Sequence, residues 1–265
     1  MHQKNGFELL NDYFDKIYVI SIERNFDARH PKLSDNLKGL NYEIFKGVDG
    51  KDLIEESIQD IYDDRIARNK FSDYCLYSFG HRVERSFSKS EIGCAKSHLN
   101  IYKEIIEKGY QKVLIFEDDA KIVNDNIHLI SEIIDQIPEN CDLLYWGYRW
   151  YDSESKLSRF KRLFLLSPIS IFLSLFRRDK VNLNERYPKP FRKHVWKSGY
   201  HCGAHAYSIN FNTAKKLLDY NSPIIMLADQ LFAEMNREGD INAYVTVPLI
   251  FREDQTMISS IVEKK

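Results

Sequence analysis

The chain reads Val113-Leu114-Ile115-Phe116-Glu117-Asp118-Asp119-Ala120 shortly before its midpoint, and this run is its strongest structural signal. Four apolar residues, two of them β-branched, are typical of a buried strand. Three consecutive carboxylates follow, and adjacent carboxylates repel one another unless water or a cation neutralises them. At the end of a buried strand in an α/β sheet, this cluster would lie where a metal-bound phosphate group binds. A solvated acidic turn is the simpler alternative.

A helix is predicted directly before this strand. Ser88-Lys89-Ser90-Glu91 fits a capping box, and Gly109 supplies a stop. Between them, apolar residues recur at helical spacing, namely Ile92, Ala95, Leu99, Tyr102 and Ile106. Further strands are predicted at 16–22, 42–45, 142–148, 203–209 and 241–250, and further helices at 31–39, 53–66, 213–218 and 228–237. The aromatic stretch 69–87 predicts a long loop. Alternation of strands and helices indicates the α/β class.

Composition is that of an ordinary globular protein. The 265 residues are 43% hydrophobic and 29% charged, which excludes wholesale disorder. The net charge of −1 gives no overall attraction to nucleic acid. Residues 149–200 are the exception, with 13 Lys and Arg against 4 Asp and Glu, a local balance of +9. We expect a single domain over 1–265, with 149–200 as an insert or subdomain.

Targeting and redox signals point to the cytoplasm as the expected location. Residues 1–15 lack the basic-then-apolar order of a signal peptide, and no apolar run reaches about 18 residues. The cysteines are scattered without a CxxC pair and are expected to be reduced thiols. They are Cys75, Cys94, Cys141 and Cys202.

Taken in order, several segments resemble glycosyltransferase family 25, which includes bacterial lipooligosaccharide galactosyltransferases and collagen hydroxylysine galactosyltransferases. The resemblance spans most of the chain except 149–200, and its specific part is Glu-Ile-Gly-Cys-x-x-Ser-His set about twenty residues before Phe-Glu-Asp-Asp-Ala. Ser90 replaces a usual glycine, Gly47 a usual alanine, and Lys96 could change a contact within the helix motif. The matching segments are 18–24, Val48-Asp49-Gly50, 90–98, 114–120, Ala206-Tyr207-Ser208-Ile209, Asp229, Gln255 and Ser259-Ser260-Ile261.

The resemblance implies a GT-A-type, Rossmann-like mixed sheet flanked by helices, a UDP-sugar donor, and Mn²⁺ or Mg²⁺ as cofactor. By position, Asp119 is the best candidate for direct metal contact, with Glu117 toward the metal or the ribose and the role of Asp118 open. Hard oxygen ligands suit these cations, which would neutralise a departing diphosphate. The remaining donor-binding residues implied by the resemblance are Ser21, Arg24, Val48, Asp49, Ser97 and His98.

Several residues of these motifs also have a purely structural interpretation. His98 could be a satisfied, half-buried histidine, and Val48-Asp49-Gly50 a simple tight turn. Arg24 could bind diphosphate or lie on the surface. Gly93 and Cys94 are interpreted as close-packing residues, with Cys94 not a nucleophile.

Inverting transfer also needs a base that deprotonates the acceptor hydroxyl. The family position falls on Asp229, which could equally be a helix cap. Glu234 and Asp254 are the reserve candidates for this base.

The resulting hypothesis is inverting, metal-dependent transfer of a hexose, with galactose expected, to a hydroxyl of lipooligosaccharide or another surface glycan, giving a β-linkage. Two alternatives belong to other classes. One is an inactive protein that keeps the fold for binding or adhesion, and the other is a metal-dependent phosphohydrolase.

The basic insert suggests a partner of its own. Cationic residues flank the apolar run 163–176, whose fourteen residues are too few to span a bilayer and include Pro168. The run could simply pack over the core. Alternatively, it could contact an anionic membrane surface peripherally, at the inner face of the cell membrane, beside a glycolipid acceptor.

Overall fold

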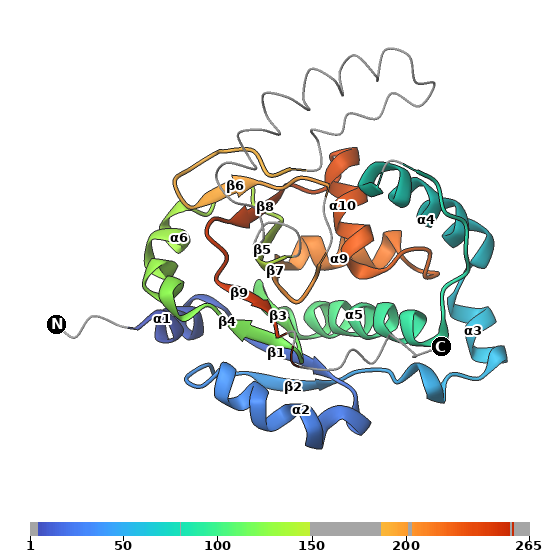
Figure 1. Ribbon diagram of the computed structural model, residues 1–265, viewed down its shortest axis with the longest axis horizontal. Helices are drawn as coiled ribbons and strands as arrows, with labels where there is room; N and C mark the ends of the chain where they lie inside the picture. The colour runs from blue at the N-terminus through green and yellow to red at the C-terminus, as the bar shows by residue number, and fades with distance from the viewer. Residues whose placement is uncertain (1–4, 80, 149–186, 201–202, 255, 257–265) are drawn as a thin grey trace, which may run out of the picture.

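The computed structural model describes residues 5–79, 81–148, 187–200, 203–254 and 256. Its centre is a seven-stranded mixed sheet with the order β2-β1-β3-β7-β5-β8-β6 (Figure 1). The strands of this sheet are β1 (Lys16–Ser21), β2 (Glu43–Lys46), β3 (Lys112–Glu117), β5 (Leu143–Gly147), β6 (Val195–Lys197), β7 (Ala206–Asn210) and β8 (Ala243–Thr246). A separate antiparallel pair joins β4 (Ala120–Ile122) to β9 (Phe251–Glu253).

Helices lie on both sides of the sheet, which confirms the predicted α/β class with a mixed sheet flanked by helices (Figure 1). The α-helices are α1 (Gly6–Tyr13), α2 (Glu23–Asn36), α3 (Glu55–Ile61), α4 (Asp64–Phe79), α5 (Lys89–Lys108), α6 (Ile130–Gln136), α9 (Phe211–Tyr220) and α10 (Ala228–Glu238). Two short 3₁₀ helices are η1 (Gly50–Asp52) and η2 (Asn124–Leu129).

The central strand β3 is buried on both faces, which explains its unbroken apolar run. Val113 and Ile115 belong to a core cluster with residues of α4, α5, α9 and α10. Leu114 and Phe116 belong to a second cluster with residues of α1, α2 and α6. All four side chains are fully buried, and burial of each such side chain contributes about 1.5–3 kcal/mol. This double burial fixes where β3 ends and where its carboxylates emerge.

The order of the first three strands creates a binding edge. β1 lies between β2 and β3 and is parallel to both, so their carboxyl ends meet at one edge of the sheet. The chain passes from β1 to β2 on one side and later returns to β3 on the other, which makes this edge a topological switch point. The register pairs Ile20 with Glu117 and therefore brings Ser21 beside Asp118.

The predicted helix before β3 is confirmed together with its caps. Ser88 Oγ accepts a hydrogen bond from the Glu91 N–H at 3.3 Å, and a Glu91 carboxylate oxygen accepts one from the Ser88 N–H at 2.8 Å. Gly109 closes α5 with a φ of 71°, a left-handed conformation that glycine adopts without penalty. Because both ends are specified locally, α5 is held in a definite position relative to β3.

Two predictions for residues 53–87 are wrong. The expected loop over 69–87 is largely the helix α4, whose buried residues Phe71, Tyr74 and Cys75 lie at helical spacing and pack into the core. The expected single helix over 53–66 is instead two helices, because Tyr62 between them is extended and forms a parallel bridge with Ile224. Tertiary contacts thus override the local pattern in this part of the chain.

Two boundaries also differ from the prediction. Pro31 does not begin a helix but lies inside α2, which starts at Glu23 directly after β1. The strand predicted at 241–250 is reduced to β8, because Pro248 follows it and has no N–H for the ladder.

Most of the basic insert, residues 149–186, lies outside the described residues, so its packing and membrane contact stay predictions. The single-domain organisation also remains a prediction. The part of the insert that the structure describes contains β6, at one edge of the sheet. Among the described residues, no helix combines the length and the apolar character needed to cross a bilayer.

Candidate functional site

A cavity opens at the carboxyl edge of β1, β2 and β3, and the N-terminal halves of α2 and α5 line it. It brings together residues that are far apart in the sequence and that were predicted to bind donor or metal. The predicted residues that line it are Ser21, Arg24, Val48, Asp49, Ser97, His98, Glu117, Asp118 and Asp119. Asp229 is not one of its lining residues.

The loop after β2 is fixed directly on α5. The Val48 N–H donates a hydrogen bond to Ser97 Oγ at 2.8 Å, and the Ser97 hydroxyl donates to the Gly93 carbonyl at 2.7 Å. A Cβ on Gly93 would lie 2.8 Å from both the Val48 carbonyl oxygen and the Gly50 nitrogen. The close-packing interpretation of Gly93 is therefore confirmed. Val48-Asp49-Gly50 is a turn whose position depends on this contact with the helix.

Arg24 and Asp49 form an ion pair beside the cavity. Arg24 Nε lies 2.7 Å from Asp49 Oδ2, and the Arg24 side chain is one-third exposed. The other Asp49 oxygen accepts a hydrogen bond from the Lys51 N–H at 3.0 Å. An anion in the cavity would therefore have to share Arg24 with Asp49. The structure thus brings Arg24 and Asp49 together, and their ion pair restricts the motion of both side chains.

Asp118 is held by partners within the protein. Its two carboxylate oxygens accept hydrogen bonds from the Ser21 hydroxyl at 2.9 Å and from the Arg29 guanidinium. Burial raises the pKa of Asp118, while Arg29 and Ser21 oppose that rise by stabilising the charged form. Asp118 therefore anchors the end of β3 to β1 and α2.

Asp119 differs from Asp118 in that one of its carboxylate oxygens is not engaged by a donor in the described structure. Its Oδ1 atom is buried and has no hydrogen-bond partner among the described residues. Burial, together with the nearby charges of Glu117 and Glu253, raises the pKa of Asp119 to about 8. Its backbone is fixed, because the Asp254 N–H donates to the Asp119 carbonyl at 2.7 Å. A buried carboxylate oxygen without a donor, beside further carboxylates, is the environment that a hard divalent cation satisfies.

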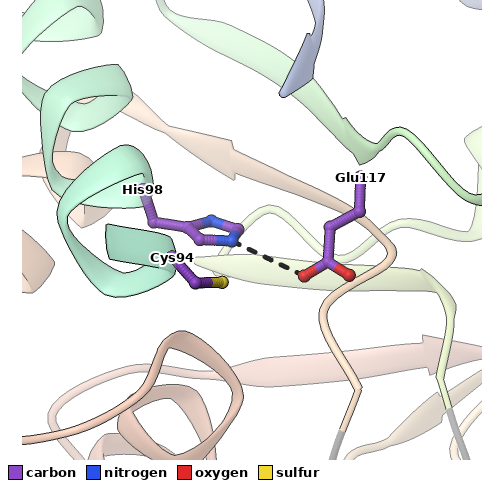
Figure 2. A group of neighbouring side chains, drawn as sticks. All are labelled: Cys94, His98 and Glu117. Atoms are coloured by element: carbon purple, nitrogen blue, oxygen red, sulfur yellow. Dashed lines mark ion pairs between the residues drawn. The ribbon is translucent and has the colours of Figure 1, made fainter. Parts of the chain in front are cut away.

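His98 is fully buried, where a half-buried side chain was the structural expectation, and it also lines the cavity. Its Nδ1 shares a hydrogen bond of 2.7 Å with the Tyr207 hydroxyl, which lies 3.2 Å from the Tyr102 hydroxyl. Its Nε2 lies 3.6 Å from Glu117 Oε1 in the cavity. Figure 2 shows His98 and Cys94 of α5 on the side that faces Glu117 of β3.

Cys94 does not have the properties of a nucleophile. Burial and the charges of Glu117 and Asp229 raise the pKa of its thiol well above the usual range. The protonated thiol therefore predominates at neutral pH, and thiolate is the reactive form.

The candidate bases differ in their availability. Asp229 lies in the first turn of α10, where its carboxylate accepts hydrogen bonds from the Gln230 N–H at 2.9 Å and the Gly203 N–H at 3.2 Å. Glu234 is buried with Lys70 at 3.1 Å and Arg237 at 3.0 Å. Burial favours a raised pKa of Glu234, but the two cations outweigh it and lower the pKa. A carboxylate held in this way is a poor base, so the structure argues against Glu234.

The other reserve candidate, Asp254, is also engaged. Its carboxylate accepts hydrogen bonds from the Thr256 backbone N–H at 3.0 Å and hydroxyl at 2.8 Å. Burial acts to raise the pKa of Asp254, yet these hydrogen bonds outweigh it and lower the pKa. Asp254 therefore stabilises its own loop beside Asp119.

Sequence reasoning missed three residues of this site. Arg29 pairs with Asp118, Tyr207 orients His98, and Glu253 contributes charge beside Asp119. Arg29 lies in α2, shortly after the end of β1 in the sequence. This short sequence separation is the signal that could have placed Arg29 near the strand ends. Nothing local marks Glu253 as part of the site, because only the pairing of β4 with β9 brings it there.

Comparison with known proteins agrees with the resemblance seen in the sequence motifs. A family model described as "Glycosyltransferase family 25 (LPS biosynthesis protein)" matches residues 14–232. The human "Inactive glycosyltransferase 25 family member 3" is 26% identical over 149 residues, which cover 54% of this chain and 23% of that protein. Human "Procollagen galactosyltransferase 2" is 26% identical over 140 residues, or 51% of this chain and 21% of that protein. The matches thus span less than a quarter of the length of these relatives.

Solved structures show weaker likenesses. Mouse xyloside xylosyltransferase 1 in its apo form has a TM-score of 0.36 at 10% identity, covering 86% of this chain and 70% of that chain. A glycosyltransferase involved in the glycosylation of the major capsid of PBCV-1 has a TM-score of 0.36 at 9% identity, covering 92% and 94%.

Proposed function

The chain belongs to glycosyltransferase family 25, and we propose that it transfers a hexose from a UDP-sugar to an acceptor hydroxyl, with inversion and with a divalent cation. The observation that carries this proposal is the buried Asp119 oxygen without a hydrogen-bond donor in the described structure. Asp119 and Glu117 both line the cavity at the switch point of the sheet.

The carboxylates of Glu117 and Asp119 fit Mn²⁺ or Mg²⁺, since both cations prefer hard oxygen ligands. When bound, the cation would supply Lewis-acid neutralisation of the departing diphosphate. Asp118 would take no direct part, because its oxygens are engaged by Ser21 and Arg29. It would instead keep the end of β3 rigid, so that the two neighbouring carboxylates keep their positions.

The remaining lining residues would bind the nucleotide part of the donor. The Val48-Asp49 loop and the end of β1 at Ser21 form one wall of the cavity, and Ser97 fixes that loop. Arg24 would approach the diphosphate while it stays paired with Asp49, which limits its motion. His98, held by Tyr207, would line the inner end near Glu117.

We propose Asp229 as the base that takes the proton from the acceptor hydroxyl. The charge of Asp229 raises the pKa of Cys94, which lines the cavity, whereas Asp229 itself is not a lining residue. Its hydrogen bonds from two backbone N–H groups would hold the carboxylate in one orientation. If Asp229→Ala keeps substantial turnover at saturating donor, the base is another group.

The donor sugar and acceptor are inferred from the relatives. A relative bears the name procollagen galactosyltransferase, and the family description mentions LPS biosynthesis. We therefore propose UDP-galactose as donor and a hydroxyl of lipooligosaccharide or a related surface glycan as acceptor, giving a β-linkage. A cytoplasmic enzyme at the inner face of the cell membrane would meet a lipid-linked acceptor there.

A donor screen tests the proposal. Purified protein is incubated with each UDP-sugar and Mn²⁺ without acceptor, and slow release of UDP is measured. We expect release from one donor, with UDP-galactose preferred, and its loss in Asp119→Asn. The matched control is Asp125→Asn, which alters an exposed carboxylate in η2 and should leave release unchanged. Equal release by Asp119→Asn and wild type would overturn the metal assignment.

A second candidate is a non-catalytic member of the family that keeps the fold for binding. The names of human, rat and mouse relatives contain the word "inactive". Such a protein would bind UDP yet release none from any UDP-sugar, with or without acceptor. A phosphohydrolase has less support, since the described residues contain one three-residue group of potential metal ligands, and that group includes a thiol.

A further inference from the structure

Cys94, His98 and Glu117 converge at one point of the cavity. Their potential ligand atoms, one from each residue, all lie within 4.8 Å of one another. Cys94 and His98 are four residues apart on α5 and therefore share one face of the helix. Figure 2 shows that this face is turned toward Glu117 at the end of β3. The three groups thus come from two rigid elements.

The spacing of these atoms suits a small cation. In a tetrahedral zinc site with bonds of about 2.0–2.1 Å to nitrogen and oxygen, two such ligand atoms are separated by about 3.3 Å. His98 Nε2 and Glu117 Oε1 are 3.6 Å apart, and the Cys94 sulfur lies within 4.8 Å of the ligand atoms of both, so binding would need the three side chains to draw closer together. The Glu117 side chain is one-third exposed, so part of it faces the open side of the cavity rather than packed protein.

The orientation of His98 is already that of a metal ligand. Its Nδ1 is engaged by the Tyr207 hydroxyl at 2.7 Å, and Tyr207 is in turn next to Tyr102. When Nδ1 carries the hydrogen and donates it to Tyr207, Nε2 presents its lone pair to the cavity. An outer hydrogen bond of this kind fixes both the tautomer and the ring plane of histidine ligands.

We propose that Cys94, His98 and Glu117 form a binding site for a thiophilic divalent cation, Zn²⁺, with the fourth position open to the cavity. A thiolate, an imidazole and a carboxylate together favour Zn²⁺ over Mn²⁺ or Mg²⁺, which prefer oxygen ligands. The thiolate and carboxylate charges balance the cation in a partly buried place. The thiol proton passes to bulk water as the zinc–sulfur bond forms.

This site has a consequence that rests on the proposed function. Glu117 is shared with the carboxylate pair that would hold Mn²⁺ beside the diphosphate. Zn²⁺ bound to Cys94 and His98 would draw Glu117 toward α5 and away from Asp119. Zn²⁺ would therefore inhibit Mn²⁺-dependent turnover, and Cys94 would set that sensitivity.

Zinc binding is measured on the full chain by competition with a chromophoric chelator, without any donor. We expect one tight equivalent in wild type. Cys94→Ser should weaken it by at least about 100-fold, because even outer partners of metal ligands are worth about 10–100-fold. The matched control is Cys75→Ser, a buried free cysteine on α4, which should bind as wild type does. Co²⁺ should give a thiolate charge-transfer band in wild type and in Cys75→Ser but not in Cys94→Ser.

Asp119→Asn separates this site from the proposed manganese site. It should keep the tight zinc equivalent and the cobalt band, even where Mn²⁺-dependent UDP binding is lost. The proposal is overturned if wild type binds no tight Zn²⁺, if Cys94→Ser binds it equally well, or if Asp119→Asn abolishes it. A protein that binds Zn²⁺ as expected but shows no UDP-sugar turnover would refute the proposed function alone.

Discussion

Gly93 in α5 lies against the backbone of Gly50, so closely that a Cβ on Gly93 would come within 2.8 Å of the Gly50 nitrogen. The loop is equally close to the start of the same helix, since a Cβ on Gly50 would lie 2.2 Å from the Lys89 carbonyl oxygen. All of these neighbours are backbone atoms, which cannot turn aside as a side chain can. The loop that carries Val48 and Asp49 therefore keeps its place only while both positions lack a side chain.

Gly93→Ala should displace this loop and destabilise the protein. An alanine inside a helix normally gains up to about 1 kcal/mol over glycine, but here overpacking should cost about 1–3 kcal/mol. We expect a lower free energy of unfolding in denaturant titrations and weaker UDP binding.

Gly109→Ala is the control for the same helix. It strains a residue with a φ of +71° but meets nothing within 4 Å, so it should lower stability without changing UDP affinity. Unchanged stability and affinity in Gly93→Ala would contradict the tight contact.

Asp119→Asn should stabilise the metal-free protein at pH 8. The pKa of Asp119 is raised by burial and by Glu117 and Glu253 to about 8, whereas an unfolded aspartate titrates near its usual value of about 3.9. Between about pH 4 and pH 8 the folded state therefore holds the extra proton, so wild-type stability falls as pH rises through that window. The variant lacks this slope and should be more stable by about 1–3 kcal/mol at pH 8.

Mn²⁺ should offset the stability advantage of the variant. A cation that binds only the folded state at 100 times its dissociation constant adds about 2.7 kcal/mol, and only wild type should gain it. Thermal unfolding at several pH values, with and without Mn²⁺, measures both effects. If the stability of the two proteins changed with pH in parallel, the pKa of Asp119 would not be raised in the folded state.

Arg29→Met should be strongly destabilising because it leaves Asp118 as a buried carboxylate without its cation. Both side chains are about nine-tenths buried, and breaking such a pair costs about 3–5 kcal/mol. The double variant Arg29→Met with Asp118→Asn should recover part of that loss, since the buried charge is gone. Denaturant unfolding of the complete cycle measures the coupling.

The control on the same helix is Lys32→Met, an exposed residue whose replacement should have little effect. Additive losses in the double variant would mean that Arg29 and Asp118 do not stabilise each other.

Glu234→Gln should destabilise the protein at neutral pH and flatten its acid sensitivity. Burial alone would raise the pKa of Glu234, but Arg237 and Lys70 hold it below its usual range. The stability from these pairs is therefore present above the unfolded pKa of about 4.3 and is lost as pH falls through the lower folded pKa. We expect a loss of about 1–3 kcal/mol at pH 7.

Glu238→Gln is the matched control, because Glu238 is one-third exposed and lies near the same two cations. Its loss should stay below about 1 kcal/mol. Equal losses in the two variants would argue against a special role for the buried carboxylate.

The parts of the fold that the sequence predicted are those with local signals. The strand at Lys112–Glu117 is apolar on both faces, and α5 carries a capping box and a glycine stop within its own residues. The helix α4 has no comparable signal, and its apolar side chains pack on residues outside the helix. Phe71 packs on Phe87, and Tyr74 packs on Tyr200. A local reading of this aromatic stretch therefore predicted a loop.

The candidate site was likewise predictable only where its signals are local in the sequence. The carboxylates after β3 and the residues of the α5 motif could be predicted, because their resemblance to a family is written in contiguous segments. The pairings among them could not be predicted, because Ser21 meets Asp118 across 97 positions only through the parallel register of β1 and β3. Glu253 reaches the cluster only through the pairing of β9 with β4. The sequence predicted candidate ligands, and the tertiary structure shows which of their polar atoms are already engaged by other side chains.

Calorimetric titration of UDP into the metal-depleted protein, with and without Mn²⁺, tests whether Glu117 and Asp119 form a cation-dependent nucleotide site. We expect UDP to bind wild type with Mn²⁺ and to bind at least tenfold more weakly without it, by about 1.4 kcal/mol or more. Asp119→Asn should show no gain from Mn²⁺. Failure of UDP to bind wild type in the presence of Mn²⁺, or equal binding with and without the cation, would contradict the assignment.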